Sequence, residues 1–169
     1  EVPMATKSSF TTDEWKTVLG SPMLVGMAVT LAEPSGLWGL MNEGMASGRA
    51  VMDAKNDAGA TELAKAIAAE MEGSEGRGDA RGGLRAELTG KTPAELKRQV
   101  LAALTRVGQI VDSKAPGEAP AFKSWLTHVA EKVAEASTEG GFMGIGGVQV
   151  SAAEKASLTD VARALGTVQ

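Results

Sequence analysis

The sequence predicts an all-α fold, a single bundle of five to six helices, and three observations lead to this prediction. Apolar residues recur at intervals of three and four along most of the 169 residues, which is the spacing of amphipathic helices. Capping boxes begin at Thr11, Thr92 and Ser151, each with a Glu three residues later. The best strand candidate, residues 147–150, is too short to build a sheet.

The N-terminal half predicts three helices followed by a loop. The first helix is expected over 12–32 with a pause at the Gly-Ser-Pro of 20–22. The next two are expected at about 37–54 and 60–72, each with apolar residues on one face. Residues 73–91 hold six glycines among charged residues. This stretch is therefore interpreted as a long Gly-rich mobile loop.

The C-terminal half predicts three more helices. Thr92 as N-cap and Pro93 at the first helical position start a helix that runs to about residue 113. A second is expected over 119–137, and the last follows Ser151 and ends near Leu165.

The whole chain is expected to form one domain. Residues 1–10 are predicted to be a disordered tail that opens with a short cloning remnant before Met4. Residues 11–169 are assigned to a single helical bundle that carries the flexible loop.

Composition and charge exclude several classes of function. The chain has no cysteine and one histidine, so thiol catalysis, disulfides, cysteine zinc sites and multi-histidine metal sites are impossible within it. With 17 basic and 21 acidic residues the net charge is −4, and no basic stripe supports nucleic-acid binding. No signal peptide is recognised, which predicts a cytoplasmic protein. We expect no catalytic residue, cofactor or metal, and hence no enzyme.

The chain has a single histidine, His128. It lies three residues after Trp125 and is expected at the boundary of the core. Counting residues leaves a Ser-His-Asp arrangement open, but no G-x-S-x-G nucleophile elbow is present.

Two glycine turns share one pattern of residue classes. Residues 35–40 and 140–145 both read small, Gly, apolar, apolar, Gly, apolar. The match suggests two related helical hairpins, near 12–54 and 119–166, about a pseudo-twofold axis. It predicts a paired surface for a protein partner or for self-association, and two unrelated connections that solve the same turn problem are the alternative. The candidate surface residues are Leu37, Trp38, Phe142, Met143 and Ile145.

Five methionines fall within 30 residues of each other. Methionine is flexible and polarisable, so such a cluster fills an irregular core, lines an apolar pocket or binds a soft metal such as copper. The candidates for an apolar pocket are Met23, Met27, Met41, Met45 and Met52.

Residues 17–42 contain a single charged residue, Glu33. The uncharged stretches on either side of the breaks are shorter than the about 20 apolar residues that cross a bilayer. Two buried helices with a turn between them are the favoured interpretation. A membrane-active hairpin is disfavoured and is kept as an alternative.

The last 35 residues resemble the TerB-like tellurite-resistance domains of bacteria. That family has a turn Asp-Gly-x-Ile/Val-Ser with a Glu three residues later, and Val150, Ser151 and Glu154 match it. Gly147 and Val148 replace the family's acidic residue and glycine. The resemblance implies a stress-linked, non-enzymatic interaction module.

Together these observations predict a non-enzymatic bacterial helical protein that acts as an interaction or scaffold module and forms a homo-oligomer. A carrier of a small apolar ligand, using the methionine cluster, is the second hypothesis. The membrane-active hairpin is the third.

Overall fold

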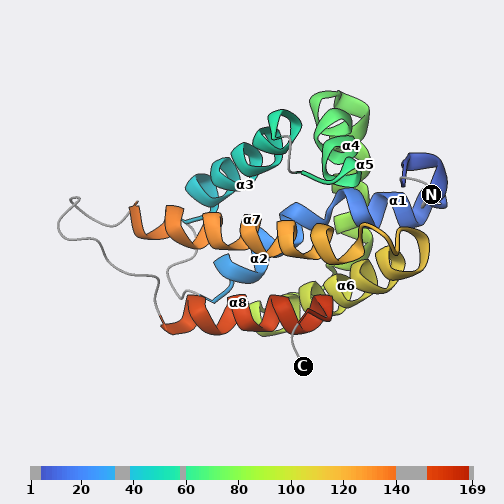
Figure 1. The fold of residues 1–169 in the computed structure, drawn as a ribbon. Helices are drawn as coiled ribbons and strands as arrows, with labels where there is room; N and C mark the ends of the chain where they lie inside the picture. The colour runs from blue at the N-terminus through green and yellow to red at the C-terminus, as the bar shows by residue number, and fades with distance from the viewer. Residues whose placement is uncertain (1–4, 33–38, 58–59, 140–151, 168–169) are drawn as a thin grey trace.

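The structure is a computed structural model that describes residues 5–32, 39–57, 60–139 and 152–167. Within these ranges the chain is all-α, as predicted, with no strand (Figure 1). Eight α-helices pack as a bundle in the part of the chain that the structure describes, so the expected number of five to six was too low. The helices are α1 (Thr12–Leu19), α2 (Ser21–Thr30), α3 (Gly39–Asn56), α4 (Glu62–Glu72), α5 (Ser74–Glu87), α6 (Pro93–Lys114), α7 (Ala119–Glu139) and α8 (Ala152–Leu165), preceded by a 3-10 turn, η1 (Lys7–Ser9).

The predicted pause at residues 20–22 is a helix boundary. Gly20 ends α1 and also precedes the first turn of α2. Pro22 is tolerated there because the first helical N–H groups have no intrahelical acceptor. The Ser21 hydroxyl donates a hydrogen bond of 2.6 Å to the carbonyl oxygen of Val18. One expected helix therefore becomes two.

The expected mobile loop at 73–91 was wrong, because most of it forms the helix α5. Glycine disfavours a helix interior by about 1 kcal/mol relative to alanine, which is why the sequence suggests a loop. The helix α5 packs closely against α1, and glycine allows this close approach because it has no side chain. A Cβ atom added to Gly83 would lie 3.0 Å from the carbonyl oxygen of Lys16.

The helix α2 lies at the centre of the bundle. It packs against α3, α6, α7 and α8, and most of its residues are buried (Figure 1). The stretch 17–42, which was considered as a membrane hairpin, thus contains α2, a helix of the core. No helix in the described part of the chain is both long enough and apolar enough to span a membrane.

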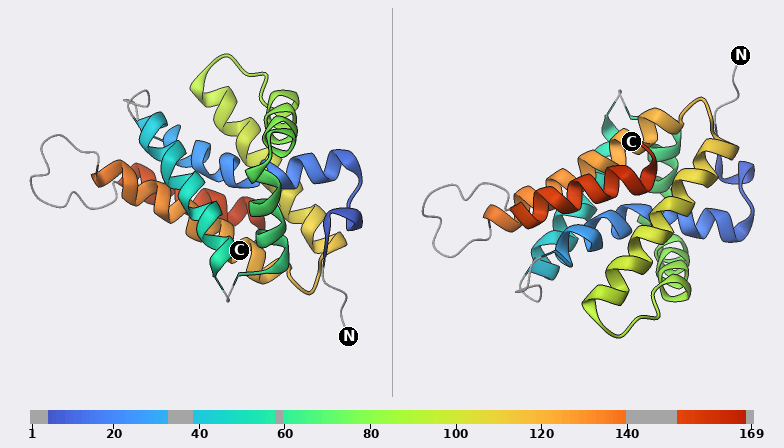
Figure 2. Two further views of the ribbon diagram at one scale, coloured as in Figure 1. Left: turned by 90° about the horizontal axis from the view of Figure 1, so that it is seen from above. Right: turned by 90° about the horizontal axis from the view of Figure 1, so that it is seen from below.

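Apolar stripes on the two longest helices, α6 and α7, form a large part of the core. Figure 2 shows α8 lying alongside α7, with α6 inclined to both and packed more closely against α8. The buried stripe residues are Val100, Leu104, Val107 and Val111 of α6 and Phe122, Leu126, Val129 and Val133 of α7.

The N-terminal segment is more ordered than the expected tail of residues 1–10. Ala5 and Phe10 are buried on either side of the turn η1. The Phe10 ring lies 5.6 Å from that of Trp15, centroid to centroid. The apolar side chains at both ends of this segment hold it against the bundle, and residues 1–4 lie outside the described part.

Candidate functional site

An apolar groove of about 620 Å³ lies among α2, α3, α4 and α5. Four methionines contribute to its lining, so we call it the methionine groove. Its lining residues are Pro22, Met23, Gly26, Met27 and Thr30 of α2, Gly48, Arg49, Val51, Met52 and Asp53 of α3, Met71 of α4, and Arg77 and Leu84 of α5.

The groove is hollow because small residues line it on α2 and α3. Met23 and Met27 are four residues apart and therefore share one face of α2. Gly26 lies between them in the sequence and also lines the groove. On α3, a Cβ atom added to Gly48 would meet no atom within 4 Å. Gly48 therefore borders open space.

The methionine side chains remain accessible from solvent. Met52 is 40% exposed, and it is the only exposed large hydrophobic residue among the described ones. Met23, Met27 and Met71 are half-buried and pack against the core. An apolar ligand entering the groove would cover these side chains, whereas the buried core offers no comparable access.

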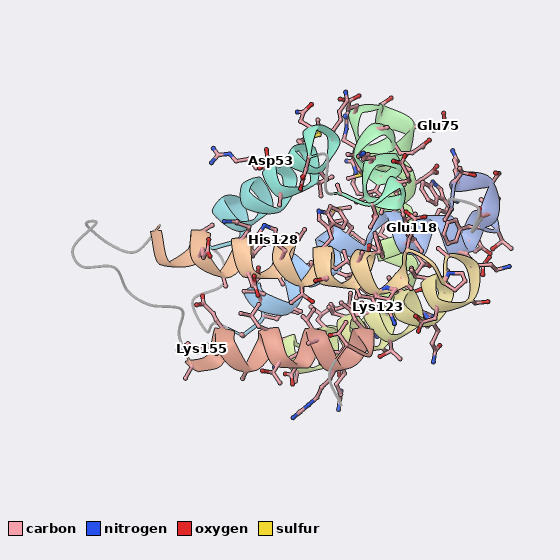
Figure 3. All side chains as sticks on the ribbon, in the orientation of Figure 1. Asp53, Glu75, Glu118, Lys123, His128 and Lys155 are labelled. Carbon is pink, nitrogen blue, oxygen red and sulfur yellow. The ribbon has the colours of Figure 1, made fainter. Side chains whose placement is uncertain are left out.

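Charged groups in the lining are few and come from two helices, α3 and α5. Arg77 donates hydrogen bonds to the carbonyl oxygens of Met71, at 3.1 Å, and Glu72, at 2.8 Å, and so caps the end of α4. Arg49 and Asp53 lie one turn apart on α3, where Figure 3 labels Asp53. Neither forms a hydrogen bond or ion pair with its side chain in the described part of the chain.

The structure brings together three of the five methionines predicted to line an apolar pocket. Met23, Met27 and Met52 all line the groove. Met41 and Met45 belong to α3, but their side chains lie outside the described residues.

Two further apolar residues of the groove were not predicted to belong to it. Met71 belongs to the apolar face of the helix expected at 60–72, and Leu84 lies in the stretch 73–91 that is expected to form a loop. Their contribution depends on how α4 and α5 pack, for which a single helix carries no signal.

The candidate interaction surface at the two glycine turns lies outside the described part of the chain. This holds for Leu37, Trp38, Phe142, Met143 and Ile145. The matching turns and the pseudo-twofold relation therefore stay predictions.

A second, more polar hollow of about 590 Å³ lies along one face of α7. Lys123 lies in it, with a buried side chain and its Nζ atom 2.8 Å from a carboxylate oxygen of Asp112. His128 and Ser124 line the same hollow, but the described residues show no hydrogen bond between them. The His128 ring is exposed rather than at the boundary of the core, with Nδ1 3.7 Å from a Glu131 oxygen (Figure 3).

No arrangement typical of metal binding is present among the described side chains. They contain no group of three or more His, Asp or Glu residues placed to bind a metal ion. In the polar hollow the Lys123 ammonium is already paired with Asp112. The methionine groove is consequently the candidate functional site, and apolar contact is the chemistry that it offers.

Comparison of the chain with protein-family models, with curated proteins and with solved structures gives no match. The resemblance to the TerB-like domains therefore stays a prediction. Two of the residues that carry it, Val150 and Ser151, lie outside the described part of the chain.

Proposed function

We propose that this chain is a non-enzymatic binding protein that holds a small apolar ligand in the methionine groove. The observation that carries the proposal is the groove itself. Its volume of about 620 Å³ falls within the range of about 300–1,000 Å³ that is typical of small-molecule sites. A mainly apolar lining with a few polar groups is also typical of such sites.

The type of side chain supports a ligand rather than a structural role for the groove. Methionine has three rotatable bonds and a polarisable sulfur, so it adapts to ligands of different shape. Four such side chains from three helices surround one hollow. A core would bury them, whereas Met52 is 40% exposed.

The protein-interaction role expected from the sequence remains the second candidate. Its proposed surface lies outside the described residues, so the described geometry favours the ligand-binding role. A protein partner and a ligand in the groove are compatible with each other, because the two sites involve different residues.

Titration with the fluorescent apolar probe 1-N-phenylnaphthylamine tests the proposal. We expect saturable binding to the wild type with one probe per chain. Gly48→Leu should abolish it, because the new side chain extends into open space at the groove wall. Gly82→Ala is the matched control, since that position is also open but lies outside the groove.

The fold of Gly48→Leu is checked by circular dichroism and by its unfolding midpoint. We expect both to stay at or above the wild-type values, because leucine favours a helix interior more than glycine does. Failure of the wild type to bind the probe, or equal binding by a folded Gly48→Leu protein, would overturn the proposal.

A further inference from the structure

We propose that the ligand of the methionine groove is an amphiphile with a single negative charge, and that Arg49 binds its anionic group. This inference rests on the proposed function and specifies the class of ligand. It predicts that an apolar chain ending in a carboxylate binds better than the same chain ending in a neutral or cationic group.

Arg49 lies where it can bind an anionic group at the groove. Arg49 follows Gly48 directly on α3, is exposed, and lines the groove. In the described structure its guanidinium forms no ion pair or hydrogen bond. A guanidinium presents five N–H donors in a planar fork that matches a carboxylate. Arg49 thus places unused donors at an apolar site.

The charge around the groove carries the second step. Arg49 and Arg77 contribute two positive charges and Asp53 contributes one negative charge, so the charged lining sums to +1. The chain as a whole has a net charge of −4, which makes this local excess the reverse of the overall balance. A cationic ligand would meet two like charges here, and an anionic ligand is favoured.

The size of that charge carries the third step. One negative charge neutralises the lining, whereas a doubly charged group would leave an excess beside Asp53. Arg77 already donates to the carbonyl oxygens of Met71 and Glu72. Arg49 is therefore the residue with free donors, and the carboxylate is the group that matches it in charge and shape.

Competition against the bound fluorescent probe tests the inference with three ligands of equal chain length. We use decanoate, decanol and decyltrimethylammonium below their aggregation concentrations. For the wild type we expect decanoate to displace the probe at about one-tenth of the decanol concentration, since hydrogen bonds to charged groups are the stronger kind. Decyltrimethylammonium should be the weakest competitor.

Two arginine variants locate the effect. Arg49→Gln should lose most of the preference for decanoate over decanol, with each displacement constant corrected for the variant's own affinity for the probe. Arg98→Gln removes the same charge from α6, outside the groove, and should keep that preference. Raising the salt concentration should weaken decanoate binding to the wild type more than decanol binding.

The outcomes separate the two proposals. Equal displacement by decanoate and decanol, or an equal loss in both variants, would overturn the inference and leave the apolar site intact. Absence of probe binding that is sensitive to Gly48→Leu would overturn the proposed function and the inference with it.

Discussion

Glu118 joins two segments that are far apart in the sequence. One of its carboxylate oxygens accepts a hydrogen bond of 2.9 Å from the N–H of Ala5, and the other accepts one of 3.1 Å from the N–H of Leu63. Leu63 lies in the first turn of α4, where backbone N–H groups have no intrahelical acceptor. One side chain just before α7 thus fixes both the N-terminal segment and the start of α4.

Removing this side chain should destabilise the fold measurably. We expect Glu118→Ala to lower the free energy of unfolding by about 1–3 kcal/mol, the range for a buried polar group that loses its partner. Glu118→Gln retains one acceptor oxygen and should cost less. Urea unfolding measures both, with the exposed Glu131→Ala as control. A Glu118→Ala protein as stable as the control would contradict this role.

Glu14 provides a pH-dependent contribution at the start of α1. Its pKa is lowered from the usual 4.5, first by the backbone N–H of Thr11 and further by the Thr11 hydroxyl and the charge of Lys114, while desolvation opposes the shift. The N–H of Thr11 donates to Oε1 of Glu14 at 2.8 Å, and the Thr11 hydroxyl accepts from the N–H of Glu14. These contacts form the capping box that the sequence predicts.

The sign of the pH effect follows from the lowered pKa. The ionised Glu14 stabilises the folded chain fully above its unfolded pKa, near 4.5, and this contribution is lost as the pH falls through the lower folded value. Glu14→Gln keeps a capping side chain without the charge. We expect the wild type to be the more stable protein at pH 7 and the difference to shrink towards pH 3. A difference that is constant over this range would refute the assignment.

At the scale of elements, α5 is held by close packing rather than by helix propensity. Four of its 14 residues are glycines, and only Gly76 and Ala80 are buried. Added Cβ atoms at Gly78 and Gly82 would meet nothing within 4 Å, whereas one at Gly83 would press on the backbone of α1. Gly78 and Gly82 therefore only weaken the helix, whereas Gly83 permits the close approach of α1.

Alanine substitutions should separate these roles. Gly78→Ala and Gly82→Ala are each expected to stabilise the fold by about 1 kcal/mol, because alanine favours the helix and the space is free. Gly83→Ala should gain less or destabilise, because its Cβ atom would lie 3.0 Å from the Lys16 carbonyl oxygen. Thermal unfolding of the three variants gives the comparison. A destabilised Gly82→Ala protein would show that α5 does not form as described.

The same helix shows where prediction from the sequence ends. The capping boxes at Thr11 and Thr92 mark helix starts because their contacts span three residues of one segment. The apolar spacing likewise identifies the buried face of α6. The helix α5 was missed because its stability depends on α1, a contact that local spacing does not encode.

At the scale of the whole molecule, the groove depends on four helices meeting around a hollow. The cluster of Met23, Met27 and Met52 could be predicted because α2 and α3 follow each other in the sequence. Met71 and Leu84 could not, because α4 and α5 reach the groove through the packing of the bundle. For a site between helices, the sequence predicts only those lining residues that come from helices adjacent in the chain.

The position of the bound ligand tests the central claim most directly. Nuclear magnetic resonance of protein labelled with carbon-13 at the methionine methyl groups reports on each methionine during titration with decanoate. We expect the resonances of Met23, Met27, Met52 and Met71 to shift together with ligand concentration, and Gly48→Leu to suppress the shifts. Unchanged resonances of these four methionines at saturating ligand would contradict the account.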